Sequence, residues 1–363
     1  YDANTRIANG TASNLNTSRV HTGLLPAFFS FNAKSPTWNG MTGTARISFA
    51  PQINTNGPKT AINYGSGITG ASNDVREVVF NLDGSFGQIS MGRTLSLFGR
   101  QAILNDQTLF GVGANGANFY GGTTLGRIGY GYIYPDFSSR IQYTTPNMNG
   151  FQVSAGIFDP STASTTSGTA ANEWSTPRFE GEMSFTTNLS NASVMLWADG
   201  LYQSLDSTGP GVDSLDSYGV GAGAKIGFGG FEFVGYYSDS SGLTGSSALL
   251  QFGGPNVEDN SGTAFEGADA QTYYVQGAYS FGATKIAASY GQNEVDIDLA
   301  PGIADNIRNK NEMYTVGVYH DVTSWLKLVA EYNHMEGETV TGGGANTTPG
   351  DADTFSVGSF FFW

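Results

Sequence analysis

The chain has 363 residues, of which 13% are charged and 51 are glycine, and its formal net charge is −15. The charged fraction is about half of the usual ~25%, and the negative balance argues against a nucleic-acid partner, which requires clustered Lys and Arg. Cysteine is absent, which excludes a disulfide framework and a thiolate metal site. No window offers the ~18 or more apolar residues of a membrane helix. Hydrophobicity is instead spread thinly along the chain.

Two kinds of connection alternate from the N-terminus onward. Seven joints are very short and rich in Asn-Gly, Asp-Gly or Gly-Gly pairs, which tolerate the positive φ of tight hairpins. The intervening joints are long and polar, and they hold many of the acidic residues. This pattern predicts β-hairpins with tight turns on one side and long loops on the other. The short joints lie at 35–40, 82–85, 145–150, 188–191, 227–230, 280–284 and 321–324.

The segments between these joints alternate with a period of two, which is typical of strands. In 41–50, Ile47 and Ala45 share one face and Arg46 and Thr44 the other, and Val316 and Val318 likewise oppose Thr315. The segments are long enough to cross a bilayer at a tilt, which takes about 9–11 residues. One face therefore suits lipid and the other suits water.

The last residues, "FSVGSFFFW" at 355–363, continue this alternation to the C-terminus. An apolar terminal strand needs a partner on both edges and an apolar solvent on one face. Counting from the segment at 20–33 gives fifteen strands. Because bacterial single-chain barrels have an even number of strands, a first strand is expected before residue 20. Residues 1–8 either form that strand or are the remainder of a longer one.

Two hairpins carry a resemblance to a known family. Residues 77–93, "EVVFNLDGSFGQISMGR", and residues 138–156, "SSRIQYTTPNMNGFQVSAG", resemble the hairpins before and after the constriction loop of general bacterial porins. The terminal aromatic Trp363 is similar to the assembly signal of that family, although porins most often end in Phe. The resemblance covers most of the chain as architecture, and its motifs are concentrated in residues 40–158.

The resemblance implies an all-β fold, a 16-stranded antiparallel transmembrane β-barrel in the bacterial outer membrane, with residues 1–363 as a single domain. The third loop, about 94–137, would fold inward and narrow a water-filled channel. Such a protein would be a homotrimer surrounded by outer-membrane lipid and lipopolysaccharide. It would pass ions and small hydrophilic solutes by diffusion, with no enzymatic step, no cofactor and no metal.

Charged and aromatic residues of this region are the candidates for the pore constriction. Arg46 matches a basic wall position of the family and also has inward parity on its strand, while Arg93 and Arg140 match by resemblance alone. Where porins commonly carry Pro-Glu-Phe-Gly-Gly, this chain has "NFYGG" at 118–122, so an acid is missing from the loop. We therefore predict a basic to neutral constriction formed by Arg46, Arg93, Arg100, Asp106, Phe119, Tyr120, Arg127 and Arg140.

The acidic residues cluster in the other long loops, where they can attract cations to the channel mouth. Permeation depends mainly on close charges, because salt screens beyond about 8 Å at physiological ionic strength, so weak anion preference or little selectivity is expected. Three alternatives stay open: a channel selective for a small anionic or aromatic solute, an adhesin or receptor, and an outer-membrane hydrolase. The last lacks a "GxSxG" signature in the sequence.

Overall fold

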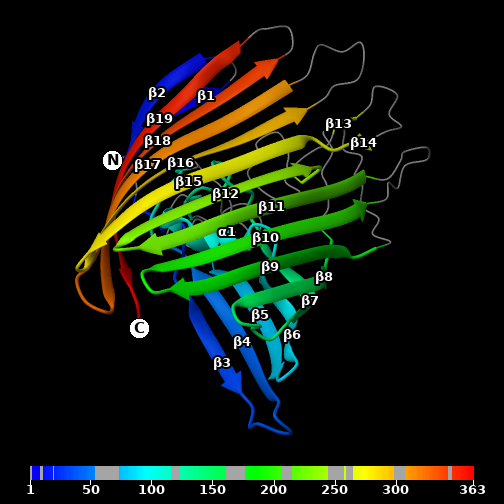
Figure 1. Ribbon diagram of the computed structural model, residues 1–363. Helices are drawn as coiled ribbons and strands as arrows, with labels where there is room; N and C mark the ends of the chain where they lie inside the picture. Colours follow the sequence, from blue (N-terminus) through cyan, green and yellow to red (C-terminus); the bar gives the residue numbers. More distant parts are fainter. Residues whose placement is uncertain are drawn as a thin grey trace.

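The computed structural model describes residues 2–8, 11–18, 20–53, 73–115, 123–160, 176–205, 215–243, 257–258, 265–297, 307–341 and 346–363. Nearly all of its regular structure is β-strand, arranged as one strongly curved sheet (Figure 1). The strands before the long inward segment are β1 (Asp2–Ala8), β2 (Thr11–Thr17), β3 (Phe29–Lys34), β4 (Thr42–Pro51), β5 (Asn73–Gly84) and β6 (Gly87–Leu95). Those after it are β7 (Phe137–Thr144), β8 (Phe151–Phe158), β9 (Arg178–Leu189), β10 (Ala192–Leu205), β11 (Leu215–Phe228), β12 (Phe231–Ser241), β13 (Val257–Glu258), β14 (Phe265–Glu266), β15 (Asp269–Phe281), β16 (Thr284–Ile297), β17 (Ile307–Asp321), β18 (Leu326–Thr341) and β19 (Asn346–Phe361).

Seventeen of these strands belong to the large sheet, and every register between neighbours is antiparallel. Strands β3 to β12 and β15 to β19 are the fifteen strands predicted downstream of residue 20, each paired with the next. Strands β13 and β14 form a separate two-stranded sheet. The prediction of an all-β antiparallel fold is confirmed.

Residues 2–8 form a strand, β1. Strand β1 pairs with β19 through Asp2 and Thr354, and it also forms a hairpin with β2. Since each pairing reverses the direction, β2 and β3 run the same way. Within the described residues no ladder joins β2 to β3, so the sheet is not closed there, and the count of sixteen strands stays a prediction.

All seven predicted short joints are hairpin turns. The Asn-Gly pairs adopt the positive φ expected of them, with 47° and 74° at Asn39 and Gly40, and 55° and 97° at Asn149 and Gly150. Glycine is favoured at such positions because a Cβ is strained in the left-handed region. The turn chemistry therefore fixes which strands are neighbours.

Two of these glycines differ in the space around them. A Cβ on Gly150 would overlap the Thr186 carbonyl oxygen, whereas a Cβ on Gly40 would meet nothing within 4 Å. Gly40→Ala should lower the free energy of unfolding by about 1–2 kcal/mol through backbone strain alone. Gly150→Ala should cost roughly 1–3 kcal/mol more, since the neighbouring strand has to move. Urea unfolding of the two variants in lipid vesicles, followed by tryptophan fluorescence, checks this order; equal midpoints would contradict it.

The two faces of the sheet differ as the alternation predicts. On β17, Val316 and Val318 are 51% and 40% exposed, while Thr315, the residue just before Val316, is 1% exposed. On β19, Phe355, Val357 and Phe361 are exposed, whereas Phe360 packs on the inner side against buried residues. The convex face is thus apolar and the concave face largely polar, which is the arrangement for lipid outside and water inside.

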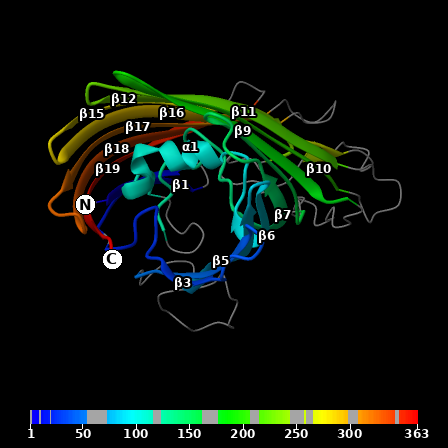
Figure 2. The same ribbon diagram turned by 60° about the horizontal axis from the view of Figure 1, so that its bottom comes forward.

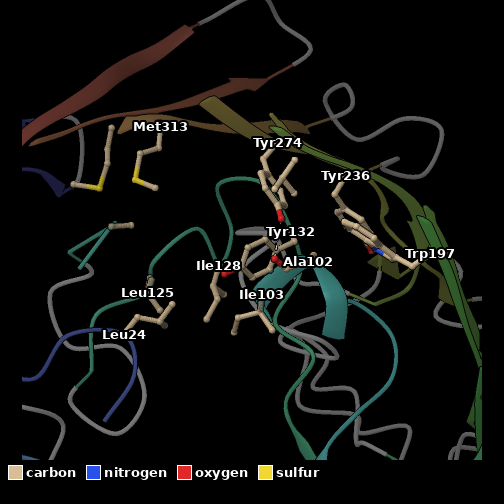
Figure 3. Packing of buried hydrophobic residues seen from close by; sticks show 13 residues of the cluster. Leu24, Ala102, Ile103, Leu125, Ile128, Tyr132, Trp197, Tyr236, Tyr274 and Met313 are labelled. Carbon is tan, nitrogen blue, oxygen red and sulfur yellow. Dashed lines mark hydrogen bonds between the residues drawn. The ribbon is translucent and has the colours of Figure 1, made fainter. Parts of the chain in front are cut away.

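Residues 96–115 and 123–136 lie on the concave side of the sheet (Figure 2). They contain α1 (Arg100–Asn105) and the 3-10 helix η1 (Gln107–Phe110). Among the described residues, neither helix has the length and hydropathy needed to span a membrane. Ile103, Ile128 and Tyr132 of this segment pack against Tyr274 of β15 and Leu24 of the β2–β3 connection (Figure 3). A buried core therefore exists inside the curve of the sheet.

Candidate functional site: a polar cavity beside α1

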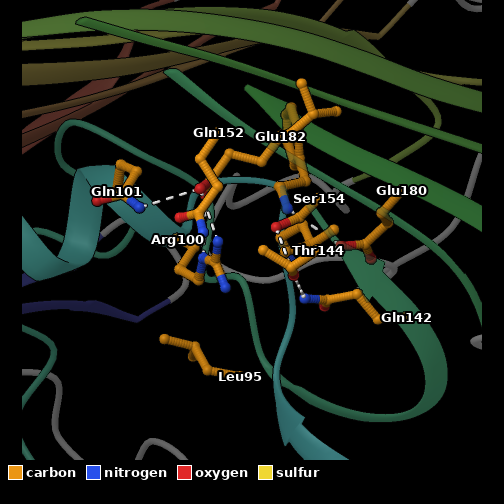
Figure 4. A network of polar contacts seen from close by, with 12 residues as sticks. Leu95, Arg100, Gln101, Gln142, Thr144, Gln152, Ser154, Glu180 and Glu182 are labelled. Atoms are coloured by element: carbon orange, nitrogen blue, oxygen red, sulfur yellow. Dashed lines mark hydrogen bonds and ion pairs between the residues drawn. The ribbon is translucent and has the colours of Figure 1, made fainter. Parts of the chain in front are cut away.

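A cavity of about 880 Å³ lies between α1 and the inner faces of β3 to β8. Part of its wall is the polar network in Figure 4. Cross-strand register explains the polar lining, because the even positions of β3, β4, β6, β7 and β8 and the odd positions of β5 share the concave face. Its polar lining residues are Asn32, Lys34, Thr44, Arg46, Glu77, Asn81, Asp83, Gln88, Ser90, Thr94, Arg100, Arg140, Gln142, Thr144, Thr145, Gln152 and Ser154.

Arg46 of β4 projects into this cavity with half of its side chain exposed. Its Nε donates to Asn32 Oδ1 at 3.0 Å, and its Nη1 lies 3.5 Å from Glu77 Oε2. Glu77 also accepts hydrogen bonds from Ser48 Oγ at 2.8 Å and Thr94 Oγ1 at 3.1 Å. The ion pair is long and partly solvated, so it neutralises Arg46 only weakly.

Arg100 enters the cavity from the other side, on α1. Its Nη2 and Nε donate to the two carboxylate oxygens of Glu182 on β9 at 2.6 and 3.0 Å, and Gln101 Nε2 donates to the same group at 3.0 Å (Figure 4). A bidentate pair of this kind fixes the direction of the guanidinium as well as its position. Arg100 is therefore both a lining charge and an anchor of α1.

Arg140 of β7 completes the basic lining. Its Nη1 donates to the Leu95 carbonyl, and its guanidinium lies 5.7 Å from the centre of the Phe158 ring. Arg178 of β9 lies 5.3 Å from the same ring and forms a buried ion pair with Glu180 at 2.9 Å. Phe158 thus holds two guanidiniums by cation–π contact, of which only Arg140 lines the cavity.

The other predicted constriction residues lie elsewhere or outside the described part. Arg93 pairs with Val78 and Ser139 and shares the outer face of β6, opposite Ser90 and Thr94. Asp106 is buried, where it caps η1 by accepting from Thr108 N at 2.9 Å. Phe119 and Tyr120 are outside the described residues. The structure therefore brings together three of the eight predicted residues at this cavity: Arg46, Arg100 and Arg140.

Arg127 is fully buried and ties the inward segment to the wall. Its Nε donates to Ser289 Oγ of β16 at 3.0 Å, and its Nη1 donates to the Met313 carbonyl of β17 at 3.1 Å. Burial lowers the pKa of this guanidinium, and the nearby Asp106 carboxylate partly opposes the shift. A side chain without exposed surface cannot line a pore, so the role of Arg127 here is to hold the inward segment against β16 and β17.

Two wall carboxylates hold the inward segment through its backbone. Glu180 of β9 accepts from Leu97 N and Phe98 N at 2.7 and 3.0 Å. Glu331 of β18 accepts from Val112 N and Gly113 N at 2.8 and 2.9 Å, and from the Tyr319 hydroxyl at 2.6 Å. Hydrogen bonds to a charged acceptor are worth about 1.5–3 kcal/mol each. The segment is therefore fixed at both ends of the concave face.

Sequence reasoning missed several of these residues. Lys34, Glu77 and Asp83 share the inward parity of their strands, so period-two alternation could have identified them. Glu182 and Glu331 have the same parity, but nothing in the sequence says which part of the inward segment each one meets. The cavity itself is lined by four basic side chains, Lys34, Arg46, Arg100 and Arg140, and by two acids, Glu77 and Asp83.

An apolar convex face, a polar concave face and a charged cavity inside the curve define a β-barrel channel of the outer membrane. The sequence matches the family model described as Gram-negative porin over residues 4–339, and the chain belongs to that family. Porins are channels that let solutes diffuse passively across the outer membrane. The comparison with curated protein sequences gave no match.

Solved structures support the same fold at low sequence identity. DcaP, an outer membrane channel of Acinetobacter baumannii, matches with a TM-score of 0.65 and 13% identity over 99% of this chain and 93% of that chain. An anion-selective porin from Comamonas acidovorans matches with a TM-score of 0.59 and 14% identity over 94% of this chain and 91% of that chain. OmpF of Salmonella typhi, solved with daunomycin, matches with a TM-score of 0.54 and 12% identity over 99% of this chain and 94% of that chain. The predicted porin fold and outer-membrane location are confirmed.

Proposed function

We propose that the cavity between α1 and β3 to β8 is the narrow part of the channel and that it favours small anions over cations. The observation that carries this proposal is the charge of the lining, where four basic side chains stand against two acids. The inward segment supports it, because Glu180 and Glu331 hold that segment across the concave face. In a pore of this build, fixed charges at the narrowest level sort ions by sign.

The net charge of −15 acts in the opposite direction but at greater range. At 0.15 M ionic strength, exposed charges more than about 8 Å apart are largely screened. An ion inside the cavity therefore interacts mainly with its lining, and the loop acids mainly raise the cation concentration at the mouth. The expected result is a modest anion preference, stronger at low salt.

The assembly we propose is a homotrimer, because OmpT of Vibrio cholerae has been solved in a trimer form. That protein matches with a TM-score of 0.51 and 16% identity over 100% of this chain and 96% of that chain. A trimer of independent channels predicts conductance steps that occur in threes. Channel closure at high voltage should then also occur in three equal steps.

Reversal potential in a planar bilayer tests the proposal. Purified protein should give large, steady openings that occur in three steps. In a tenfold KCl gradient, the reversal potential should lie toward the equilibrium potential of chloride. The anion preference should weaken as the mean salt concentration rises, because the screening length becomes shorter. A reversal potential on the potassium side would overturn the anion preference, and the absence of any conductance would overturn the open channel.

A second candidate is a channel of the same build with a preferred solute. The observation that favours it is the set of directed donors at the cavity, where Glu182 fixes the Arg100 guanidinium and Phe158 supports Arg140. Fixed donors of this kind bind carboxylates with defined geometry. Liposome swelling with increasing concentrations of small organic anions separates the two candidates: flux that saturates indicates a binding site, and linear flux indicates simple diffusion.

A further inference from the structure

Lys34 is the last residue of β3 and lines the cavity. It shares the concave face with Asn32, while Phe29 and Phe31 of the same strand are 55% and 58% exposed on the other face. The register pairs Asn32 with Arg46 and Lys34 with Thr44. At about 3.4 Å per residue, Lys34 therefore lies about 7 Å along the strand from the level of Arg46. That displacement is toward the short turns, which face the periplasm in bacterial barrels.

The basic side chains of the cavity differ in how far protein oxygens already engage them. Arg46 contacts Asn32 and Glu77, Arg100 contacts Glu182, and Arg140 donates to the Leu95 carbonyl. Lys34, in contrast, makes no hydrogen bond or ion pair with any residue that the structure describes, and its side chain is exposed to the cavity. Its ammonium group is therefore available to a passing ion.

The acid that could compete for Lys34 is Asp83 on β5. Strand β4 lies between the two residues, with Thr44 opposite Lys34 and Thr42 opposite Asp83. Lys34 and Asp83 are therefore two strands apart, and they are also offset by two residues along the strands. Asp83 accepts a hydrogen bond from Gln88 Nε2 at 2.8 Å, which holds its carboxylate toward β6. The Lys34 ammonium group and the Asp83 carboxylate therefore lie on separate parts of the cavity wall.

We propose that Lys34 is a second charge step of the anion path, on the periplasmic side of the arginines, and that it sets the specificity and the directional asymmetry of the current. The proposal rests on the proposed anion preference. A spacing of about 7 Å is shorter than the screening length of about 10 Å at 0.1 M salt. An anion at Arg46 therefore already interacts with Lys34, which lowers the barrier to leaving the arginines on that side.

Lys34→Gln tests this step, with Lys310→Gln as the matched control. Lys310 carries the same charge but lies on the outward-facing side of β17, paired with Glu312 at 3.0 Å, and it does not line the cavity. Single channels are recorded after insertion from one side, at both voltage polarities, in 0.1 M and 1 M KCl. At 0.1 M, Lys34→Gln should lower the conductance roughly twofold and reduce the current asymmetry, and at 1 M the difference should nearly vanish, since screening then reaches only about 3 Å. Lys310→Gln should match the wild type, and Lys34→Arg should restore both quantities.

The outcomes separate the two proposals. If wild-type channels prefer anions and Lys34→Gln changes neither conductance nor asymmetry at 0.1 M, the role of Lys34 is overturned while the anion preference stands. A difference that persists at 1 M also overturns it, because the effect would then come from pore shape. A wild-type reversal potential on the potassium side overturns the anion preference on which the step rests. Heat-dependent mobility on gels verifies that each variant is folded before recording.

Discussion

Replacement of Arg46 by glutamate is expected to reverse the modest anion preference of the channel. The change converts a lining with four basic and two acidic side chains into one with three of each. A unit charge at 4 Å contributes about 4 kcal/mol at an effective dielectric constant of 20, and 1.4 kcal/mol is a factor of ten in a ratio of permeabilities. The chloride-to-potassium permeability ratio should therefore fall at least about tenfold. The reversal potential in a tenfold KCl gradient measures it.

The partner of Arg46 provides a control of opposite sign. Glu77→Gln removes the acid that lies 3.5 Å from Arg46 but keeps an acceptor for Ser48 and Thr94. It should strengthen the anion preference, whereas Arg46→Glu weakens it. Both side chains stand on neighbouring strands of the same wall, so a change in pore size would move the two variants together. Shifts in the same direction, or no shift in either, would contradict control of permeation by this cavity.

The sequence predicted the sheet because its signals are local. Asn149 and Gly150 define a turn by their own backbone preferences, and Val316 and Val318 define an outer face by parity alone. Arg46 was proposed by resemblance and supported independently by its inward parity, and it lines the cavity. Arg93 was proposed by resemblance without a check of parity, and the register places it on the outer face. Arg140, proposed in the same way, does line the cavity, so resemblance alone was right at one of these two strand positions.

The inward segment could not be predicted to the same degree, because its contacts join residues far apart in the sequence. Arg127 looked like a pore charge, yet it binds Ser289 and the Met313 carbonyl on strands more than a hundred residues later. Asp106 was predicted to line the constriction, yet it caps η1. Irregular backbone has no period that indicates which side chains are buried. Such assignments depend on the path of the segment across the sheet.

Glu331→Ala is expected to have the second large effect, because it releases the inward segment from the far side of the sheet. The change leaves Val112 N, Gly113 N and the Tyr319 hydroxyl without their acceptor. Loss of two backbone bonds to a carboxylate should cost the docked segment about 3 kcal/mol or more. Gly111 fits against the Glu331 carboxylate only because it lacks a side chain. The conductance of single channels should rise and become noisy, and protease should cut the segment faster.

Glu336→Gln is the matched control for this change, since Glu336 lies on the same strand but on the outer face, 2.9 Å from His334. It should leave both conductance and protease resistance unchanged. Glu331→Gln keeps one acceptor oxygen and should give an intermediate conductance. If Glu331→Ala channels keep the wild-type conductance while protease cuts faster, the segment is docked by Glu331 but does not limit the current. The narrow level would then lie outside the cavity beside α1, and the arginines on it would no longer account for selectivity.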